Sequence, residues 1–461
     1  MDVGLIGLGV MGKNLVLNIA DHGYSVAVYN RTYNKTIEFI TETNKNTIKG
    51  YEKLEDFIFS LKEPKIIFIM VMAGTAIDKI LEEISGFLDI NAVVIDGGNS
   101  HYLDTERRCY KYFGRFNYIG CGISGGEEGA RYGPSLMPGG NKEGWVLIKE
   151  LLCGISAKFK IGENEFPCCE WMGEGGSGHF VKMVHNGIEY GDMAILSELY
   201  LIMKYLGMEN EKMADTFKSW NDEHQFSGYL LNVMELVLKK KEKQEYIINS
   251  IEDKSEQKGT GRWCVVASIE NTTPSTLMAE SVYSRFLSNQ KDLRIDFSKK
   301  IDDCLEITND INLNEDDLKR TFFMAKAVSY VQGFNLLRNG SKNNNWDLNL
   351  PSITRIWRNG CIIRSNFLEV IENIVQEVDE NFELSDIFIN ICKQNIQNLR
   401  KVVGFSICKG IPVPVLSACL EFFDILNTKR GGGNIIQALR DYFGSHMVRF
   451  LGKDEDEHVE W

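Results

Sequence analysis

The sequence has little of what membrane, secreted and metal-binding proteins need. No stretch reaches the roughly 18 to 20 apolar residues that span a bilayer, and the most apolar run, Ile66 to Ala73, is only as long as a strand. The N-terminus lacks the basic start of a signal peptide. The eleven cysteines include no CxxC pair, and an odd number in a long chain without a leader is typical of reduced thiols in the cytosol. We therefore expect a cytoplasmic protein that does not bind membranes.

The sequence also lacks histidine pairs with metal-ligand spacing and an excess of positive charge. The seven histidines show no zinc-like spacing, and no base motif accompanies a cysteine, so we expect neither a metal site nor a catalytic cysteine. The net charge of -13 argues against nucleic acid as the main partner. It leaves anionic small molecules open, because a few local Arg and Lys side chains can override the overall field. The 461 residues are 44% hydrophobic, which predicts an ordinary globular protein of two or three domains.

The first third of the chain alternates short apolar runs with Gly-rich turns and helix-sized segments. Several runs are continuously apolar, as in strands of a parallel sheet covered on both faces. Their spacing predicts βαβ units, and hence an α/β Rossmann-type N-terminal domain over residues 1–175. The predicted strands are Val3–Ile6, Ser25–Tyr29, Lys65–Met72, Ala92–Ile95 and Tyr118–Ile123.

After about Gly175 the spacing of apolar residues becomes helical, which predicts a large all-α domain over 176–427 and a C-terminal tail over 428–461. A faint echo between Lys182-Met183-Val184 and Lys326-Ala327-Val328 does not by itself establish a repeat. We expect long helices at Gly178–Tyr205, Leu318–Arg338 and Glu369–Lys401. We expect a solvated helix end at Lys239–Lys243, a polar loop at Asn339–Asn345 and a mobile acidic tail at Leu451–Trp461.

A GxGxxG motif, Gly7-Leu8-Gly9-Val10-Met11-Gly12, lies between the first predicted strand and a helical segment. In such a motif the first glycine permits a tight turn, the second lets the backbone approach a pyrophosphate, and the third allows close helix packing. Amides at the start of the helix then bind the anion. A Gly-rich turn without a ligand is the alternative, but the strand–turn–helix context favours a dinucleotide site.

The end of the second strand distinguishes the two nicotinamide cofactors. It ends in Asn30-Arg31-Thr32, without the carboxylate that accepts the ribose 2′-OH of NAD. Arg31 can clamp a 2′-phosphate, and Asn30 and Thr32 can donate to it. A surface arginine at a strand end is the alternative, and we predict NADP. Two later strand ends, Val71 to Gly74 and Asp96 to Ser100, fall where such sheets meet ligands. Asn99 there suits a position between nicotinamide and substrate, or is simply a turn residue.

The segment from Gly178 to Met193 carries the most specific pattern. On a helix its polar residues share one face, and apolar residues fill most of the rest. Buried Lys and Glu are costly unless they are paired or functional. Burial also lowers the pKa of Lys and raises that of Glu, toward the range useful for proton transfer. The alternative is a solvated polar face. The residues of the polar face are Lys182, His185, Asn186, Glu189 and Tyr190.

Two Gly-rich turns and one arginine add groups that bind anions. Ser124-Gly125-Gly126 follows a predicted strand, and the basic turn Gln257 to Trp263 contains Lys258. Arg285 lies a short distance further along the chain. Each of these could be structural by itself. Together they indicate a site for a polyhydroxy acid that bears a phosphate.

With these motifs the sequence resembles the 6-phosphogluconate dehydrogenase family along nearly its whole length. The resemblance implies NADP-dependent oxidative decarboxylation of 6-phospho-D-gluconate to D-ribulose 5-phosphate, CO2 and NADPH, in the oxidative pentose phosphate pathway. It also implies a helical domain built by duplication for substrate binding and dimerisation, and a homodimer whose tail enters the partner's active site. The sequence departs from the family at Met72, where Lys is frequent, and at Asn359, where Gly is usual. The matching runs are GLGVMG, NRT at 30–32, DGGNS, GISGGEEGA, HFVKMVHNGIEYGDM, QKGTGRW, IWRNGCIIRS at 356–365 and ALRDYFGSH at 438–446.

The resemblance also implies roles for individual residues, with Lys182 as general base and Glu189 as general acid. The implied substrate contacts are Asn99, Ser124, Gly125, Gly126, His185, Asn186, Tyr190, Lys258 and Arg285, together with Arg440 and His446 from the other subunit. The implied cofactor contacts are Gly7, Leu8, Gly9, Val10, Met11, Gly12, Asn30, Arg31, Thr32, Val71, Met72, Ala73 and Asn99.

Two other functions stay open on the sequence. A 3-hydroxyacid dehydrogenase of the same superfamily would oxidise without decarboxylation, but such chains are usually much shorter and lack the second helical half and the Arg440/His446 tail. A silent NADP-binding or scaffold protein belongs to a different class, and an intact pair of Lys182 and Glu189 argues against it.

Overall fold

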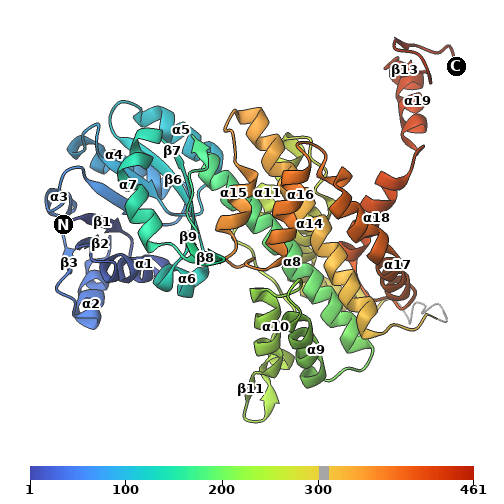
Figure 1. Cartoon of the computed structure of the whole chain (residues 1–461), viewed down its shortest axis with the longest axis horizontal. Helices are drawn as coiled ribbons and strands as arrows, with labels where there is room; N and C mark the ends of the chain where they lie inside the picture. The colour runs from blue at the N-terminus through green and yellow to red at the C-terminus, as the bar shows by residue number, and fades with distance from the viewer. Residues whose placement is uncertain (301–310) are drawn as a thin grey trace.

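The computed structural model describes residues 1–300 and 311–461 (Figure 1). An N-terminal α/β part is followed by a helical part, and the last helix projects away from the body (Figure 1). Both the Rossmann-type domain and the helical C-terminal domain of the prediction are confirmed. None of the helices within the described ranges combines the length and the apolar character that crossing a membrane requires.

The N-terminal part is built on an eight-stranded sheet with the order β10-β7-β6-β5-β4-β1-β2-β3. All neighbouring strands are parallel except β6 and β7. The strand order reverses between β1 and β4, so the ligand crevice of this sheet is expected at their carboxyl ends. The strands are β1 (Val3–Ile6), β2 (Val26–Tyr29), β3 (Ile48–Tyr51), β4 (Ile66–Ile69), β5 (Val93–Asp96), β6 (Asn117–Ser124), β7 (Ser135–Gly140) and β10 (Gly173–Glu174).

Helices cover both faces of this sheet (Figure 1), which explains the continuously apolar runs: every residue of β1, β5 and β6 is buried. Each predicted strand coincides with an observed one within three residues at either end. The covering helices are α1 (Val10–Asp21), α2 (Tyr33–Thr43), α3 (Leu54–Phe59), α4 (Thr75–Ile84), α5 (Tyr102–Tyr112), α6 (Gly126–Tyr132) and α7 (Lys142–Ile155), with the 3-10 turn η1 (Ser85–Phe87) and the hairpin of β8 (Lys158–Ile161) and β9 (Asn164–Pro167).

The helical part is organised around two long helices, α8 (Ser177–Tyr205) and α14 (Glu315–Asn344), which pack against each other (Figure 1). Around them lie α9 (Asn210–Asp222), α10 (Tyr229–Lys239), α11 (Thr260–Glu270), α12 (Thr276–Asn289), α13 (Lys291–Ser298), α15 (Leu350–Ile356), α16 (Phe367–Glu377), α17 (Asp386–Cys408) and α18 (Pro414–Asn427). The projecting end comprises α19 (Gly433–Gly444), β13 (Val448–Arg449) and β14 (Asp456–Glu457). The short elements are β11 (Lys241–Glu242), β12 (Glu245–Tyr246), η2 (Ile247–Ser250) and η3 (Phe382–Leu384).

The prediction of a polar loop at Asn339–Asn345 is wrong, because α14 continues through Asn344. Its asparagines find partners on the neighbouring segment: Asn339 donates to Thr273 at 2.8 Å and Asn343 donates to Asn271 at 2.9 Å. Asn345 then ends the helix in the left-handed conformation that asparagine tolerates. These tertiary hydrogen bonds compensate for the modest helix propensity of asparagine.

Two further predictions about the C-terminal half are corrected. The helix predicted over Glu369–Lys401 is broken between α16 and α17, where Ser385 caps α17 and donates to Glu377 at 2.5 Å. The tail Leu451–Trp461, predicted to be mobile, is folded back through the β13–β14 pair onto α19. The helix end predicted at Lys239–Lys243 is confirmed, since α10 ends at Lys239.

A buried ion pair joins the two long helices. Lys326 on α14 donates to Asp192 on α8 at 2.7 Å, and the hydroxyl of Tyr330 donates to the same carboxylate oxygen at 3.3 Å. Asp192 and Lys326 expose 1% and 6% of their surface. Removing one member of such a pair leaves the other without a counter-charge in an apolar core.

We expect Lys326→Met to lower the free energy of unfolding of the helical part by about 3 kcal/mol, measured by urea unfolding. Lys218→Met is the matched control, because it removes an exposed pair with Asp222 and should leave the transition unchanged. Equal midpoints for the two variants would contradict the stabilising role of the buried pair.

Candidate active site

The predicted catalytic helix α8 lies directly on strands β6 and β7. A Cβ on Gly122 of β6 would lie 2.4 Å from the Cβ of Lys182, and one on Gly178 of α8 would lie 2.3 Å from the carbonyl oxygen of Gly120. Only glycine fits at these contacts. The close packing buries the start of α8 and places Lys182 beside the β6 strand.

Lys182 and Glu189 occupy the same face of α8, as predicted. Lys182 exposes only 7% of its surface, and within the described residues its ammonium group has no hydrogen bond or ion pair. Burial lowers the pKa of Lys182, and the charge of Glu189 opposes this shift. Burial also raises the pKa of Glu189, against the charges of Lys182 and Arg285. Both predicted directions are confirmed, and both shifts increase the fraction of molecules with neutral Lys182 and protonated Glu189.

A fully buried histidine connects the neighbouring polar groups. His185 Nε2 lies 3.2 Å from Ser124 Oγ, and its Nδ1 lies 3.2 Å from Asn186 Oδ1 and 3.7 Å from Glu189 Oε2. Burial and the charge of Lys182 hold the pKa of His185 well below its usual range. The imidazole is therefore neutral, and its contact with Glu189 is not an ion pair. The structure thus brings together Ser124, His185, Asn186 and Glu189.

Tyr190 on α8 and Arg285 on α12 form a second group of predicted substrate contacts. The guanidinium carbon of Arg285 lies 3.6 Å from the centre of the Tyr190 ring, and Arg285 Nη1 donates to the Glu256 carbonyl at 3.3 Å. A Cβ on Gly261 would lie 2.4 Å from the Tyr190 ring. The basic turn that contains exposed Lys258 is therefore anchored beside Tyr190.

The turn after β6 also requires its glycines. Gly125 and Gly126 have φ angles of 110° and 62°, and a Cβ on Gly125 would lie 2.5 Å from the Gly360 carbonyl oxygen. This contact joins the turn to the 356–365 segment. Asn359 in that segment donates to the Lys158 carbonyl at 2.9 Å, so the side chain that replaces the usual glycine is accommodated in a loop contact.

The Gly-rich loop after β1 has the geometry that its motif predicts. Gly7 has a φ of 106°, a Cβ on Gly12 would lie 2.0 Å from the Gly7 carbonyl oxygen, and the space around Gly9 is open. The backbone N–H of Leu8 donates to Asn30 Oδ1 at 3.1 Å. Asn30 therefore links the loop to the end of β2, where Arg31 is exposed.

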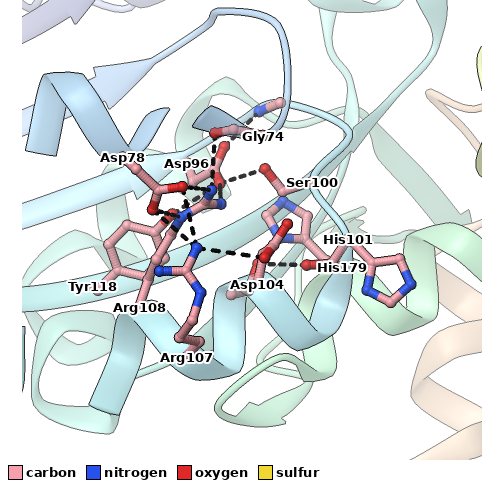
Figure 2. Close-up of polar contacts among 12 residues, drawn as sticks. Gly74, Asp78, Asp96, Ser100, His101, Asp104, Arg107, Arg108, Tyr118 and His179 are labelled. Carbon is pink, nitrogen blue, oxygen red and sulfur yellow. Dashed lines mark hydrogen bonds and ion pairs between the residues drawn. The ribbon is translucent and has the colours of Figure 1, made fainter. Parts of the chain in front are cut away.

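A buried arginine of α5, which the sequence reasoning missed, connects the loops after β4 and β5 (Figure 2). Arg108 of α5 donates to the Gly74 carbonyl at 3.0 Å and to Asp78 at 2.9 and 3.0 Å. Its Nη1 lies 3.5 Å from Asp96 Oδ2. Asp96 in turn accepts from Ser100 Oγ at 2.6 Å. On sequence alone Arg108 resembles any surface arginine of a helix rich in charge.

The exposed ends of these two loops carry the remaining predicted cofactor contacts. Met72 exposes 83% of its surface, Val71 and Ala73 are half-buried, and Asn99 is exposed. Beside them, Val10 at the start of α1 is exposed and Met11 is half-buried, and Thr32 at the end of β2 is exposed. All of them lie in the loops or at the helix start that directly follow β1, β2, β4 and β5, so the fold gathers the predicted cofactor residues at one edge of the sheet.

The single chain does not bring Arg440 and His446, the substrate contacts predicted to come from the other subunit, to α8. Both are exposed, and α19 projects away from the helical body (Figure 1). Within the described residues, no group of three or more His, Cys, Asp or Glu side chains is arranged to hold a metal.

Comparisons with known proteins agree with this geometry over the full chain. Residues 2–173 match the NAD binding domain of 6-phosphogluconate dehydrogenase, and residues 178–461 match its C-terminal domain. The chain is 43% identical to the decarboxylating 6-phosphogluconate dehydrogenase of Drosophila melanogaster and 41% identical to that of Homo sapiens, over 100% of the chain and 96% of each relative. The 6-phosphogluconate dehydrogenase of Plasmodium falciparum, solved in apo form, with its cofactor NADP+ and with its substrate 6-phosphogluconate, superposes with a TM-score of 0.92 at 37% identity, over 100% of both chains. The chain therefore belongs to the 6-phosphogluconate dehydrogenase family.

Proposed function

We propose that this chain catalyses the NADP-dependent oxidative decarboxylation of 6-phospho-D-gluconate to D-ribulose 5-phosphate, CO2 and NADPH. The observation that carries the proposal is the pair of buried Lys182 and half-buried Glu189 on one face of α8, whose pKa values are shifted toward each other. Family membership supports it, and the relatives at 41–43% identity bear the same activity in their names. We assign residues 1–175 to cofactor binding, 176–427 to substrate binding and dimerisation, and 428–461 to the tail.

The residues at the sheet edge fit NADP. The open space around Gly9 and the tight contacts of Gly7 and Gly12 leave room for a pyrophosphate at the start of α1. Arg31 and Thr32 are exposed at the end of β2, where a 2′-phosphate would lie. Bound there, NADP would supply the hydride acceptor for the oxidation at C3 of the substrate.

Lys182 and Glu189 divide the proton transfers between them. Neutral Lys182 takes the proton of the C3 hydroxyl through Nζ as C3 becomes a ketone. The resulting 3-keto acid releases its carboxylate as CO2, and the bonding electrons move onto the ketone oxygen. The Lys182 ammonium group then donates a hydrogen bond to that oxygen. Glu189 delivers its proton to the enediolate carbon that lost CO2, which is C2 of the substrate and C1 of the product, and the ketone re-forms to give the ketose product.

The surrounding groups suit a polyhydroxy chain with an anionic end. Ser124, neutral His185 and Asn186 offer hydrogen bonds to hydroxyl groups from a buried surface. Arg285 and Lys258 offer positive charge beside Tyr190. We propose that Asn99, Gly125 and Gly126 complete this surface from the loops after β5 and β6.

We further propose a homodimer in which residues 428–461 enter the partner's active site and supply Arg440 and His446. The support is an apolar stripe along the projecting helix α19 that the chain itself leaves exposed. Its members are Ile435, Ile436, Leu439, Tyr442 and Phe443. We also propose a cytoplasmic location, since all ten cysteines of the described residues are free thiols.

The reaction is tested by incubating the protein with 6-phosphogluconate and either NADP or NAD, while following nicotinamide reduction and trapping CO2. We expect reduction with NADP, one CO2 per NADPH, and a clear preference over NAD. Reduction without CO2 would replace the proposal with a simple hydroxyacid dehydrogenase. Binding of NADP without any reduction would favour a silent binding protein.

The acid role of Glu189 predicts that Glu189→Gln retains substrate binding but loses turnover by about a hundredfold or more. The amide keeps the shape of the side chain and cannot deliver a proton. Binding is measured by calorimetry and turnover by NADPH formation. Glu209→Gln, which changes an exposed glutamate, is the control and should behave as wild type. Near-normal turnover of Glu189→Gln would refute the role.

Tail exchange predicts complementation between two inactive variants. Lys182→Ala and Arg440→Ala homodimers should both be severely impaired. In a purified heterodimer, the protomer that retains Lys182 would receive the intact tail of the Lys182→Ala protomer. We therefore expect about half of the wild-type activity per heterodimer, because one of its two sites is complete. A tail that serves its own subunit would give no recovery.

A further inference from the structure

The projecting end of the chain contains a carboxylate that is completely enclosed. Asp441 exposes 0% of its surface, although most of α19 around it is exposed. Its Oδ1 accepts from the Met447 backbone N–H at 2.7 Å and lies 2.9 Å from His458 Nδ1. Its Oδ2 accepts from the Val459 N–H and the Trp461 indole N–H, each at 3.0 Å. Burial opposes ionisation, but these four partners lower the pKa of Asp441 to about 2.

The β13–β14 pair explains how residues so far apart reach one carboxylate. Val448 pairs with Glu457 and Arg449 with Asp456 in an antiparallel hairpin. The hairpin reverses the chain direction after α19 and returns residues 458–461 to the helix. The last four residues of the chain are thereby fixed to the same helical turn that carries Arg440.

One turn earlier on α19, a single amide group contacts both predicted substrate residues. Gln437 Oε1 accepts from Arg440 Nη1 at 3.0 Å. Gln437 Nε2 donates to the carbonyl oxygens of His446 at 3.2 Å and Met447 at 2.6 Å. The side chain of Arg440 and the backbone of His446 are therefore linked through Gln437.

His446 itself lies between two residues with unusual backbone angles. Ser445 and Met447 have φ angles of 52° and 60°, in the left-handed region that residues with a side chain disfavour. The Ser445 N–H donates to the Asp441 carbonyl at 2.8 Å, and the Met447 N–H donates to the Asp441 side chain. Such a turn persists only where its surroundings fix it, and such backbone conformations cluster at functional sites.

We infer that Asp441 and Gln437 are positioning residues that hold Arg440 and His446 in one fixed arrangement before the tail meets the partner's active site. The inference rests on the proposed function, because it requires that Arg440 and His446 contact the substrate. Groups held in place by neighbouring hydrogen bonds lose less conformational freedom when substrate binds. Removing those hydrogen bonds therefore weakens substrate binding even though both contacting side chains remain.

The test compares three variants that retain Arg440 and His446. Asp441→Asn replaces one acceptor oxygen with a donor, Gln437→Met removes the amide, and truncation after Glu457 removes three of the four partners of Asp441. We expect each to raise the KM for 6-phosphogluconate by about tenfold and to leave the KM for NADP within about twofold. Arg449→Met, which breaks the exposed Arg449–Asp456 pair of the same hairpin, is the matched control and should change neither KM.

All constants are measured on dimers isolated by size exclusion, so that weakened assembly does not contribute. Wild-type KM values for 6-phosphogluconate in all three variants, alongside a raised value for Arg440→Ala, would overturn the inference and leave the proposed function intact. Equal rises in both KM values would also overturn it, because a general structural defect is not selective for substrate. Absence of turnover in the wild-type protein would instead refute the proposed function.

Discussion

The backbone contact between α8 and the β6–β7 edge determines most of the geometry of the site. A Cβ on Gly139 of β7 would lie 2.4 Å from the Gly178 backbone nitrogen, and one on Gly120 of β6 would lie 2.7 Å from the imidazole of His179. No side chain fits between these elements, so the helix rests on the sheet itself. The contact excludes water from the start of α8 and fixes the distance between Lys182 and the loops at the sheet edge. A larger residue at any of these glycines would displace the helix that carries Lys182 and Glu189.

The contact between α8 and the β6–β7 edge also accounts for the pKa shifts on α8. Desolvation is the largest cause of the pKa shifts at Lys182, His185 and Glu189, and it favours the neutral form of all three. Three titratable groups can therefore lie within two turns of one helix without mutual repulsion. The charges of Lys182 and Glu189 moderate each other's pKa shift.

Local sequence patterns were sufficient for the features that depend on local geometry. The GxGxxG loop and the polar face of α8 follow from fixed spacings, and the structure reproduces both. Features that depend on distant partners were not predictable. The helical state of Asn339–Asn345 requires hydrogen bonds to Thr273 and Asn271. The enclosure of Asp441 requires a hairpin that returns the end of the chain, and the role of Arg108 requires that Asp78 of α4 reach its guanidinium group.

Two buried lysines among the described residues of the helical part allow a comparison within one molecule. Lys326 on α14 has Asp192 and Tyr330 as partners, and its charge is balanced inside the fold. Lys182 on α8 is equally buried, but within the described residues it has no hydrogen bond or ion pair. A structural lysine needs a counter-charge, because an unpaired ammonium group in a dry environment is costly. The fold gives Lys326 a direct ion pair, whereas Lys182 has only the nearby charge of Glu189 and no direct ion pair among the described residues. This difference favours the neutral form of Lys182, which is the form that the proposed proton transfer from a substrate hydroxyl requires.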